Sequence, residues 1–409
     1  MNILSTYPGP EELLECHKTL NKNEIHEVNG HVHTPFSFSA FDDIQQIFEM
    51  AKKENIKAVG INDFFVADGY EPFYKEALNN KVFPLFNIEF IGLMKKEQAK
   101  GLRINDPNNP GRCYFSGKGL NFPFSLTENL MIQLKSIITE SQVQVKSMID
   151  KANLWFKEIN VEIGLDYNQI KEKLAKELVR ERHIAKAIRL EIFEMNRNEA
   201  DRKEILKLIY GGKESKVNIT DIPALENEIR GNFLKSGGKA FVEEDEKAFL
   251  SIEQVIDLII KAGGIPCYPV LLDDKNGNYT EFEADKQKLY NNLISRNIGC
   301  IELIPGRNDF NHFKDFVRFF DEKGFVITFG TEHNSPDMIP LTCDTRSKKP
   351  LDDELRKISY EGVCVIAAHQ YLKAKGFGGF MDEKAMPKLA DKQYFIELGK
   401  AVVEKFINN

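Results

Sequence analysis

The sequence predicts an α/β fold: a distorted seven-stranded (β/α) barrel that carries an inserted helical subdomain. Three observations support this prediction. Short apolar segments alternate with amphipathic helical segments from residue 25 onward, a pattern typical of parallel strands joined by helices. The alternation stops near residue 94, gives way to a long stretch with helical spacing of apolar residues, and resumes near residue 239. Seven candidate strands result, enough to close a barrel, and the 409 residues suit one barrel with an insertion.

The first part of the predicted barrel spans residues 1–93 and contains three βα units of similar length. Its strands are expected at Ile25–His33, Ala58–Asp63 and Val82–Phe90, and its helices at Asp42–Glu54 and Tyr70–Asn79. In such a barrel the carboxyl ends of the strands meet at one mouth, so residues at these ends are the first candidates for chemistry.

Residues 94–237 are predicted to form a loop followed by the inserted subdomain. Lys95–Ser125 is rich in Gly, Pro and Asn, which indicates a long loop, and Thr127–Asn232 has helical periodicity. Residues 238–409 are predicted to complete the barrel and to end in two helices. The expected strands are Lys239–Val242, Ile265–Tyr268, Cys300–Ile304 and Phe325–Phe329; the expected helices are Ile252–Ala262, Glu283–Arg296, Phe310–Lys323, Asp352–Lys375 and Ala385–Ile407.

The composition excludes several classes of protein. The 55 basic and 62 acidic residues give a net charge of −7 without any basic tract, so bulk nucleic-acid binding is not expected. The six cysteines are scattered and form no Cys-x-x-Cys pair, which disfavours a zinc ribbon and a secreted disulfide framework. No signal-peptide pattern and no bilayer-spanning apolar run is present, so we expect a cytoplasmic protein without a membrane partner.

The candidate site begins with His31 and His33, which flank Val32. At the end of a strand, alternate side chains share a face, so both imidazoles project toward one point. Acidic and histidine residues recur at later strand ends, and together the candidate metal ligands are His31, His33, Asp63, Glu89, Glu332 and His333. Histidine nitrogens and carboxylate oxygens suit zinc, manganese or iron, and a carboxylate such as Glu89 can bridge two ions.

These motifs resemble the polymerase and histidinol phosphatase (PHP) superfamily of metal-dependent phosphoesterases. The resemblance rests on His-x-His-Thr, a strand-end Asp, a strand-end Glu, Gly-Gly-Ile before a strand and Gly-Thr-Glu-His, and it covers residues 24–93 and 239–336. It implies a PHP-type barrel with two or three metal ions at the strand ends. The segment Arg182–Ala187 also resembles the inserted subdomain of members that act on nucleotides, which implies substrate-binding roles for Arg182 and His183.

The chain departs from the family pattern at three places. His31, His33 and Glu89 occupy family ligand positions without change. The family's Thr-Asp-His is Asn62-Asp63-Phe64 here, its Ala-His-Pro is Cys267-Tyr268-Pro269, and its Gly-Ser-Asp-Ala-His is Gly330-Thr331-Glu332-His333-Asn334. Because two histidines are lost, we expect one or two divalent ions (zinc, manganese or iron) rather than three.

The roles of several other candidate residues are less specific, and most of these residues have a second, structural interpretation. Asp63 either supports a second ion or caps the following helix. Tyr268 is a candidate hydrogen-bond donor to an oxyanion. Arg307 either binds a substrate phosphate, which would make it both a catalytic and a substrate-binding residue, or pairs with a surface acid. Arg182 and His183 lie in a charged helix, for which a solvated face is the ordinary interpretation.

The function predicted from these patterns is a metal-dependent hydrolase, a phosphoesterase that acts on a small phosphorylated or nucleotide-like substrate through a metal-bound hydroxide. The alternative is a catalytically degenerate PHP-like barrel that binds a ligand or partner, because two ligand positions are lost. A third possibility is other metal chemistry, such as hydrolysis of a C–N bond or sugar isomerisation. The sequence predicts no particular oligomeric state.

Overall fold

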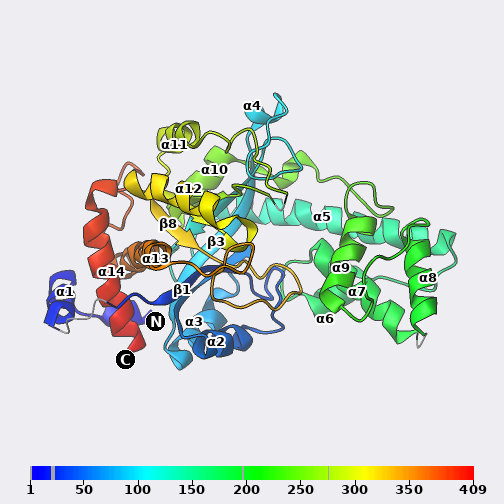
Figure 1. The fold of residues 1–409 in the computed structure, drawn as a ribbon, viewed down its shortest axis with the longest axis horizontal. Helices are drawn as coiled ribbons and strands as arrows, with labels where there is room; N and C mark the ends of the chain where they lie inside the picture. The colour runs from blue at the N-terminus through cyan, green and yellow to red at the C-terminus, as the bar shows by residue number, and fades with distance from the viewer. Residues whose placement is uncertain (1, 20–23, 196–197, 275) are drawn as a thin grey trace.

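The computed structural model describes residues 2–19, 24–195, 198–274 and 276–409 (Figure 1). A barrel-like sheet forms the centre, helices surround it, and the helices of the insertion project to one side. The predicted fold class is confirmed: the chain forms a nearly closed seven-stranded barrel with a long helical insertion. No helix of the described residues is both long enough and apolar enough to cross a membrane.

Seven strands follow one another around the barrel in the order β1-β2-β3-β4-β6-β7-β8, and the short β5 pairs with β3. Their bounds are β1 Glu27–Val32, β2 Ile56–Phe64, β3 Phe83–Leu93, β4 Arg112–Lys118, β5 Leu250–Ser251, β6 Ile265–Val270, β7 Cys300–Leu303 and β8 Val326–Phe329. A bridge between Val32 and Glu332 and a hydrogen bond from the His33 N–H to the Glu332 carbonyl (2.8 Å) bring the first and last strands together. This closure brings the carboxyl ends of β1 and β8 to the same mouth.

The barrel is mixed, because β4 runs antiparallel to both of its neighbours, β3 and β6. The prediction that Lys95–Ser125 is only a loop was therefore wrong, since this segment supplies a barrel strand. The strand has little apolar signal: Cys113 and Phe115 are buried, but Ser116, Gly117 and Lys118 complete it. Asn105, in the preceding loop, bonds to both the N–H and the carbonyl of Tyr114.

The predicted strand at residues 239–242 was also wrong, because this segment forms no strand. Ala240 is buried in the core of the insertion. The carbonyl of Phe241 accepts from Lys151 Nζ at 2.7 Å, and that of Val242 accepts from Gln144 Nε2 at 2.8 Å. Side chains of a long helix thus bind the carbonyl groups that a neighbouring strand would otherwise engage.

The surrounding helices follow the predicted alternation. In chain order their bounds are α1 Pro10–Thr19, α2 Ile44–Lys53, α3 Tyr70–Asn80, α4 Lys95–Gln98, α10 Ile252–Lys261, α11 Lys286–Ser295, α12 Phe310–Glu322, α13 Asp353–Ala374 and α14 Lys392–Ile407. Helix α2 shows why they form: Asp43 caps its first turn, and Ile44, Ile47, Phe48 and Ala51 form one buried stripe. Helix α13 is buried along most of its length, between the barrel strands and α14.

The insertion consists of α5 Glu128–Glu158, α6 Tyr167–Leu174, α7 Glu181–Glu194, α8 Glu199–Ile209 and α9 Ile222–Ile229. It has a hydrophobic core of its own, separate from that of the barrel. Helix α5 belongs to both: Leu134 and Ile137 pack in the barrel core, whereas Val145 and Phe156 pack in the core of the insertion. This helix therefore joins the insertion to the barrel, as Figure 1 shows.

Candidate metal centre

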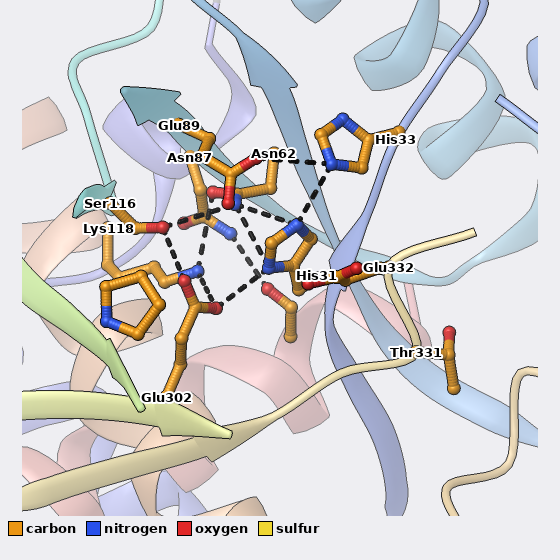
Figure 2. A network of polar contacts seen from close by, with 12 residues as sticks. His31, His33, Asn62, Asn87, Glu89, Ser116, Lys118, Glu302, Thr331 and Glu332 are labelled. Atoms are coloured by element: carbon orange, nitrogen blue, oxygen red, sulfur yellow. Dashed lines mark hydrogen bonds and ion pairs between the residues drawn. The ribbon is translucent and has the colours of Figure 1, made fainter. Parts of the chain in front are cut away.

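The side chains of His31, His33 and Glu89 meet at the mouth of the barrel (Figure 2). His31 lies on β1, His33 follows that strand, and Glu89 lies on β3. His33 Nε2 lies 3.4 Å from His31 Nε2 and 3.4 Å from Glu89 Oε2. Two ligands placed tetrahedrally at about 2.0–2.1 Å from a zinc ion are about 3.4 Å apart. The donor set and its spacing therefore fit a divalent metal ion.

His33 is held from behind by a chain of hydrogen bonds. Ser37 Oγ donates to Asp63 Oδ1 at 2.6 Å, so the same hydroxyl oxygen accepts from His33 Nδ1 at 3.2 Å. Asp63 also accepts from the N–H of Thr34 at 2.7 Å and from the Thr34 hydroxyl. This arrangement places the imidazole proton on Nδ1 and leaves Nε2 unprotonated. In this structure Asp63 supports His33; its role as a ligand of a second ion stays a prediction.

His31 is held by a network in the barrel interior. Its Nδ1 lies 3.0 Å from Glu302 Oε2, and Lys118 Nζ donates to the same oxygen at 2.5 Å. The Ser116 hydroxyl donates to the other oxygen of Glu302. Burial disfavours the charged form of Glu302, but Lys118 and then His31 hold the pKa of this carboxyl well below its usual range. The pair of Lys118 and Glu302 is therefore a buried ion pair beside the candidate ligands.

The electrostatics of Glu89 and His33 fit the binding of a cation. Burial raises the pKa of Glu89 to about 8, an effect that nearby His31 opposes and that Glu332 and Glu302 strengthen. Burial, and then the neighbouring His31, lower the pKa of His33 well below its usual value. A bound cation would favour the charged form of the buried Glu89 and would use the nitrogen lone pair of the His33 imidazole, whose protonation burial disfavours.

Glu332 and Arg307 lie at the same mouth and bind each other. Arg307 Nη2 forms an ion pair with Glu332 Oε2, which also accepts from Asn334 Nδ2 at 2.6 Å. Glu332 and His333 both have left-handed backbones, with φ of 61° and 51°. Such conformations cost on the order of 1 kcal/mol or more per residue and are concentrated at functional sites. The predicted role of Glu332 as a ligand stays a prediction, since its carboxylate is already paired with Arg307.

His333 is bound on both ring nitrogens. Its Nδ1 lies 2.7 Å from the Thr331 hydroxyl, and its Nε2 lies 2.8 Å from the carbonyl of Ile339. Its ring stacks on Phe41 with centroids 4.8 Å apart. These contacts anchor the loop after β8, and ligation of an ion by His333 stays a prediction.

Tyr268 is buried on β6, and its hydroxyl donates to Glu283 Oε1 at 2.8 Å. The N–H groups of Leu271 and Leu272 donate to the same carboxyl at 3.1 and 2.8 Å. Together these bonds fix the loop that follows β6. The structure gives Tyr268 a partner inside the protein, and its predicted role at an oxyanion stays a prediction.

A cavity of about 980 Å³ opens above the candidate ligands, between the barrel and the insertion. His31 and Glu89 line its barrel side. The lining also includes six basic residues from both parts: Arg112, Arg180, Arg182, Arg230, Lys235 and Arg307. Acidic residues, among them Glu181 and Glu244, pair with several of them. The cavity is large enough for a small organic molecule.

Arg182 lies at the start of α7 and lines this cavity, as the family resemblance implies for a substrate-binding residue. Among the residues that the structure describes it forms no ion pair, and its Nη1 donates to Asn227 Oδ1 at 3.0 Å. Burial, and then Arg230, lower the pKa of Arg182 to about 10. His183 is placed differently: its Nδ1 accepts from the Arg180 N–H at 3.0 Å, and its ring lines a second cavity of about 320 Å³.

Sequence reasoning missed three residues of this site. Glu302 is a charged residue within the otherwise apolar strand β7, a signal that was available but that the candidate list did not use. Lys118 lies on the strand that was predicted to be a loop. Arg180 covers Phe64, its guanidinium 4.8 Å from the ring centroid, at a position where the family has a histidine; only the fold brings these two residues together.

The chain is similar to one protein family model in sequence and to solved structures in fold. The PHP domain family model matches residues 29–109. No curated protein matches the chain. A solved structure from Bifidobacterium adolescentis ATCC 15703, provisionally assigned as a metal-dependent phosphoesterase, superimposes with a TM-score of 0.55 at 13% identity, covering 82% of this chain and 96% of that chain. An amidohydrolase from Chromobacterium violaceum, solved with bound sulfate and no metal, has a TM-score of 0.48 at 14% identity, covering 81% and 96%.

The family match includes His31, His33 and Glu89, the three side chains that meet at the barrel mouth. The solved phosphoesterase-like structure extends the similarity to the fold of most of the chain. The resemblance that the sequence predicts is thus confirmed: residues 29–109 match the PHP domain family model, and the barrel is PHP-like.

Proposed function

We propose that the protein is a metal-dependent hydrolase of small phosphate esters, with a nucleotide-like compound as one candidate substrate. The observation that carries the proposal is the group of His31, His33 and Glu89, whose spacing fits a divalent ion at the floor of a cavity lined by both basic and acidic residues. A divalent ion in such a site supplies activation of water and stabilisation of charge on phosphoryl oxygens. Zinc, manganese and iron all suit this donor set.

The chain's own residues account for substrate binding in this proposal. Arg182 has no acidic partner among the described residues, so its guanidinium is available for a phosphate oxygen. Arg307 lies on the barrel side of the same cavity and contacts a second oxygen when it exchanges Glu332 for substrate. The insertion covers the mouth, which favours a small substrate over a polymer. A cytoplasmic location is part of the proposal.

The test is ion content together with turnover. The purified protein is analysed for bound metals, reloaded with Mn²⁺ or Zn²⁺, and assayed with an aryl phosphate and with nucleoside monophosphates. We expect about one ion per chain and a metal-dependent release of phosphate. His31→Ala is expected to lose the ion and at least 100-fold in activity, whereas His312→Ala, at an exposed histidine bonded to Tyr279, leaves both unchanged. Absence of ion binding by the wild type contradicts the proposal.

The alternative function is ligand binding without catalysis. It is favoured by Phe64, which stands at a family ligand position and is covered by Arg180. If the wild type binds an ion and a phosphate compound but turns over no member of a broad phosphoester panel, this alternative replaces the enzyme.

A further inference from the structure

The interior of the barrel holds a buried ion pair whose members are not among the proposed metal ligands. Glu302, on β7, and Lys118, on β4, are both fully buried and paired at 2.5 Å. A buried ion pair is weak evidence for stability, since apolar residues of similar volume often serve as well. Its presence directly beside His31 therefore calls for a functional reason.

The contacts of Glu302 define the proton position of His31. Lys118 Nζ and the Ser116 hydroxyl can only donate to this carboxylate, one to each oxygen. An ionised carboxylate accepts hydrogen bonds only, so the contact of 3.0 Å to His31 requires the imidazole proton to be on Nδ1. His31 Nε2 then carries a free lone pair.

The other close neighbour of His31 does not compete for that lone pair. Asn62 Nδ2 lies 3.1 Å from Nδ1 and 3.0 Å from Nε2. A point equally distant from both nitrogens lies over the face of the ring rather than in line with either lone pair. Asn62 Oδ1 faces Lys118 Nζ at 3.4 Å, which fixes the orientation of the amide. Nε2 of His31 is therefore directed toward Nε2 of His33 and toward the candidate ion position, as Figure 2 shows.

We propose that Glu302, held by Lys118, is the positioning residue of the metal centre: it keeps the His31 proton on Nδ1 and so presents an unprotonated Nε2 to the ion. This inference rests on the proposed function, because it assigns His31 as a ligand. Lys118 neutralises the buried carboxylate and keeps it in place. Ser37 accepts a hydrogen bond from His33 Nδ1, as Glu302 does from His31 Nδ1. Both imidazoles therefore present Nε2 to the candidate ion position.

The experiment compares the wild type with the double variant Glu302→Leu, Lys118→Met, which removes both charges together and keeps similar side-chain volumes. Ser116→Ala is the matched control, because it removes a hydrogen bond to the Glu302 oxygen that does not contact His31. Folding is checked by thermal unfolding. Two quantities are then measured: the Kd for Mn²⁺, by competition with a chelator, and the His31 tautomer of the metal-free protein, by long-range ¹H–¹⁵N NMR with labelled histidine.

We expect the double variant to lose the fixed Nδ1–H tautomer and to bind Mn²⁺ about 10–100-fold more weakly, the usual cost of losing such a support. Ser116→Ala is expected to change the Kd less than about 3-fold. An unchanged tautomer overturns the inference even if binding weakens, since Glu302 would then act as a ligand itself. Unchanged affinity overturns it as well. If the wild type binds no ion, the proposed function fails, whereas the tautomer measurement still decides the role of Glu302.

Discussion

Glu283 is a carboxyl group buried outside the candidate metal centre, and its environment makes the stability of the fold depend on pH. Burial raises its pKa from 4.5 to about 8, although hydrogen bonds from Tyr268 and from two backbone N–H groups oppose the shift. Between these values the folded protein binds a proton that the unfolded chain does not. The contribution of Glu283 is therefore fully present below about pH 4.5 and is lost as the pH rises toward 8.

Replacement of Glu283 is predicted to weaken the pH dependence of the unfolding free energy. In Glu283→Gln the side chain no longer titrates, so the difference in unfolding free energy between pH 5 and pH 8 should shrink by a few kcal/mol relative to the wild type. The amide cannot accept all three hydrogen bonds, so the variant is also less stable at pH 5 by about 1–3 kcal/mol. Urea unfolding at the two pH values measures both effects. An equal change in unfolding free energy between pH 5 and pH 8 in the two proteins would show that the pKa of Glu283 is not raised.

Among single residues, the sequence predicted those whose role follows from their own position in a strand. It missed those whose role depends on a contact with a residue that is distant in the chain. His31 and His33 share a face because they alternate at the end of β1, and Glu89 lies within the apolar strand β3. Glu302 and Lys118 have a role at the site only as a pair, and 184 positions separate them in the chain. No periodicity in the sequence reports such a pair.

At the scale of elements, the strand–helix alternation was sufficient for the parallel strands and failed where the barrel becomes antiparallel. Strands β1, β2, β3, β6, β7 and β8 all lie within or overlap predicted segments. Strand β4 is bordered by a long loop and the insertion instead of by helices of the barrel, so the alternation of strands and helices did not predict it. Residues 239–242 have the composition of a strand, but bonds to α5 hold them in another conformation.

Close packing of α13 against α14 depends on one glycine. A Cβ atom built on Gly399, in α14, would lie 1.8 Å from the carbonyl oxygen of Cys364 in α13, a backbone atom that cannot rotate away. We predict that Gly399→Ala separates the two helices and costs roughly 3 kcal/mol of unfolding free energy, as overpacked cores do. Gly231→Ala is the control, since no atom lies within 4 Å of its added Cβ. Urea unfolding distinguishes them, and equal midpoints would contradict the prediction.

The first turn of α7 is predicted to bind substrate through Arg182. Arg182→Met removes the guanidinium but keeps a long side chain over Phe38. We expect at least a 10-fold rise in KM for a phosphate ester and a comparable loss of affinity for inorganic phosphate, with little change in kcat. Arg182→Lys, which keeps the charge, should recover part of the affinity. An unchanged KM in the methionine variant would remove Arg182 from the substrate site.

The molecule as a whole combines two hydrophobic cores that share one long helix. The barrel core contains the strands and α13, whereas the core of the insertion contains the second half of α5 and helices α6 to α9. Phe156 and Phe233 stack in the second core, with ring centroids 5.5 Å apart, and both are fully buried. Separate cores allow one part to open while the other stays folded.

Local opening of the insertion is therefore predicted when its core is damaged. Phe156→Ala leaves a large cavity and should cost about 3–5 kcal/mol within the insertion. Hydrogen exchange should become faster in α6 to α9 and in the second half of α5, while protection in β1 to β3 and the Kd for Mn²⁺ stay at their wild-type values. Phe83→Ala is the matched control in the barrel core, where Phe83 packs on Phe406 with centroids 5.2 Å apart. It should instead raise exchange in the barrel strands. If Phe156→Ala accelerates exchange equally in both parts, the two cores unfold as one unit, and the insertion cannot open over the cavity without loosening the metal centre.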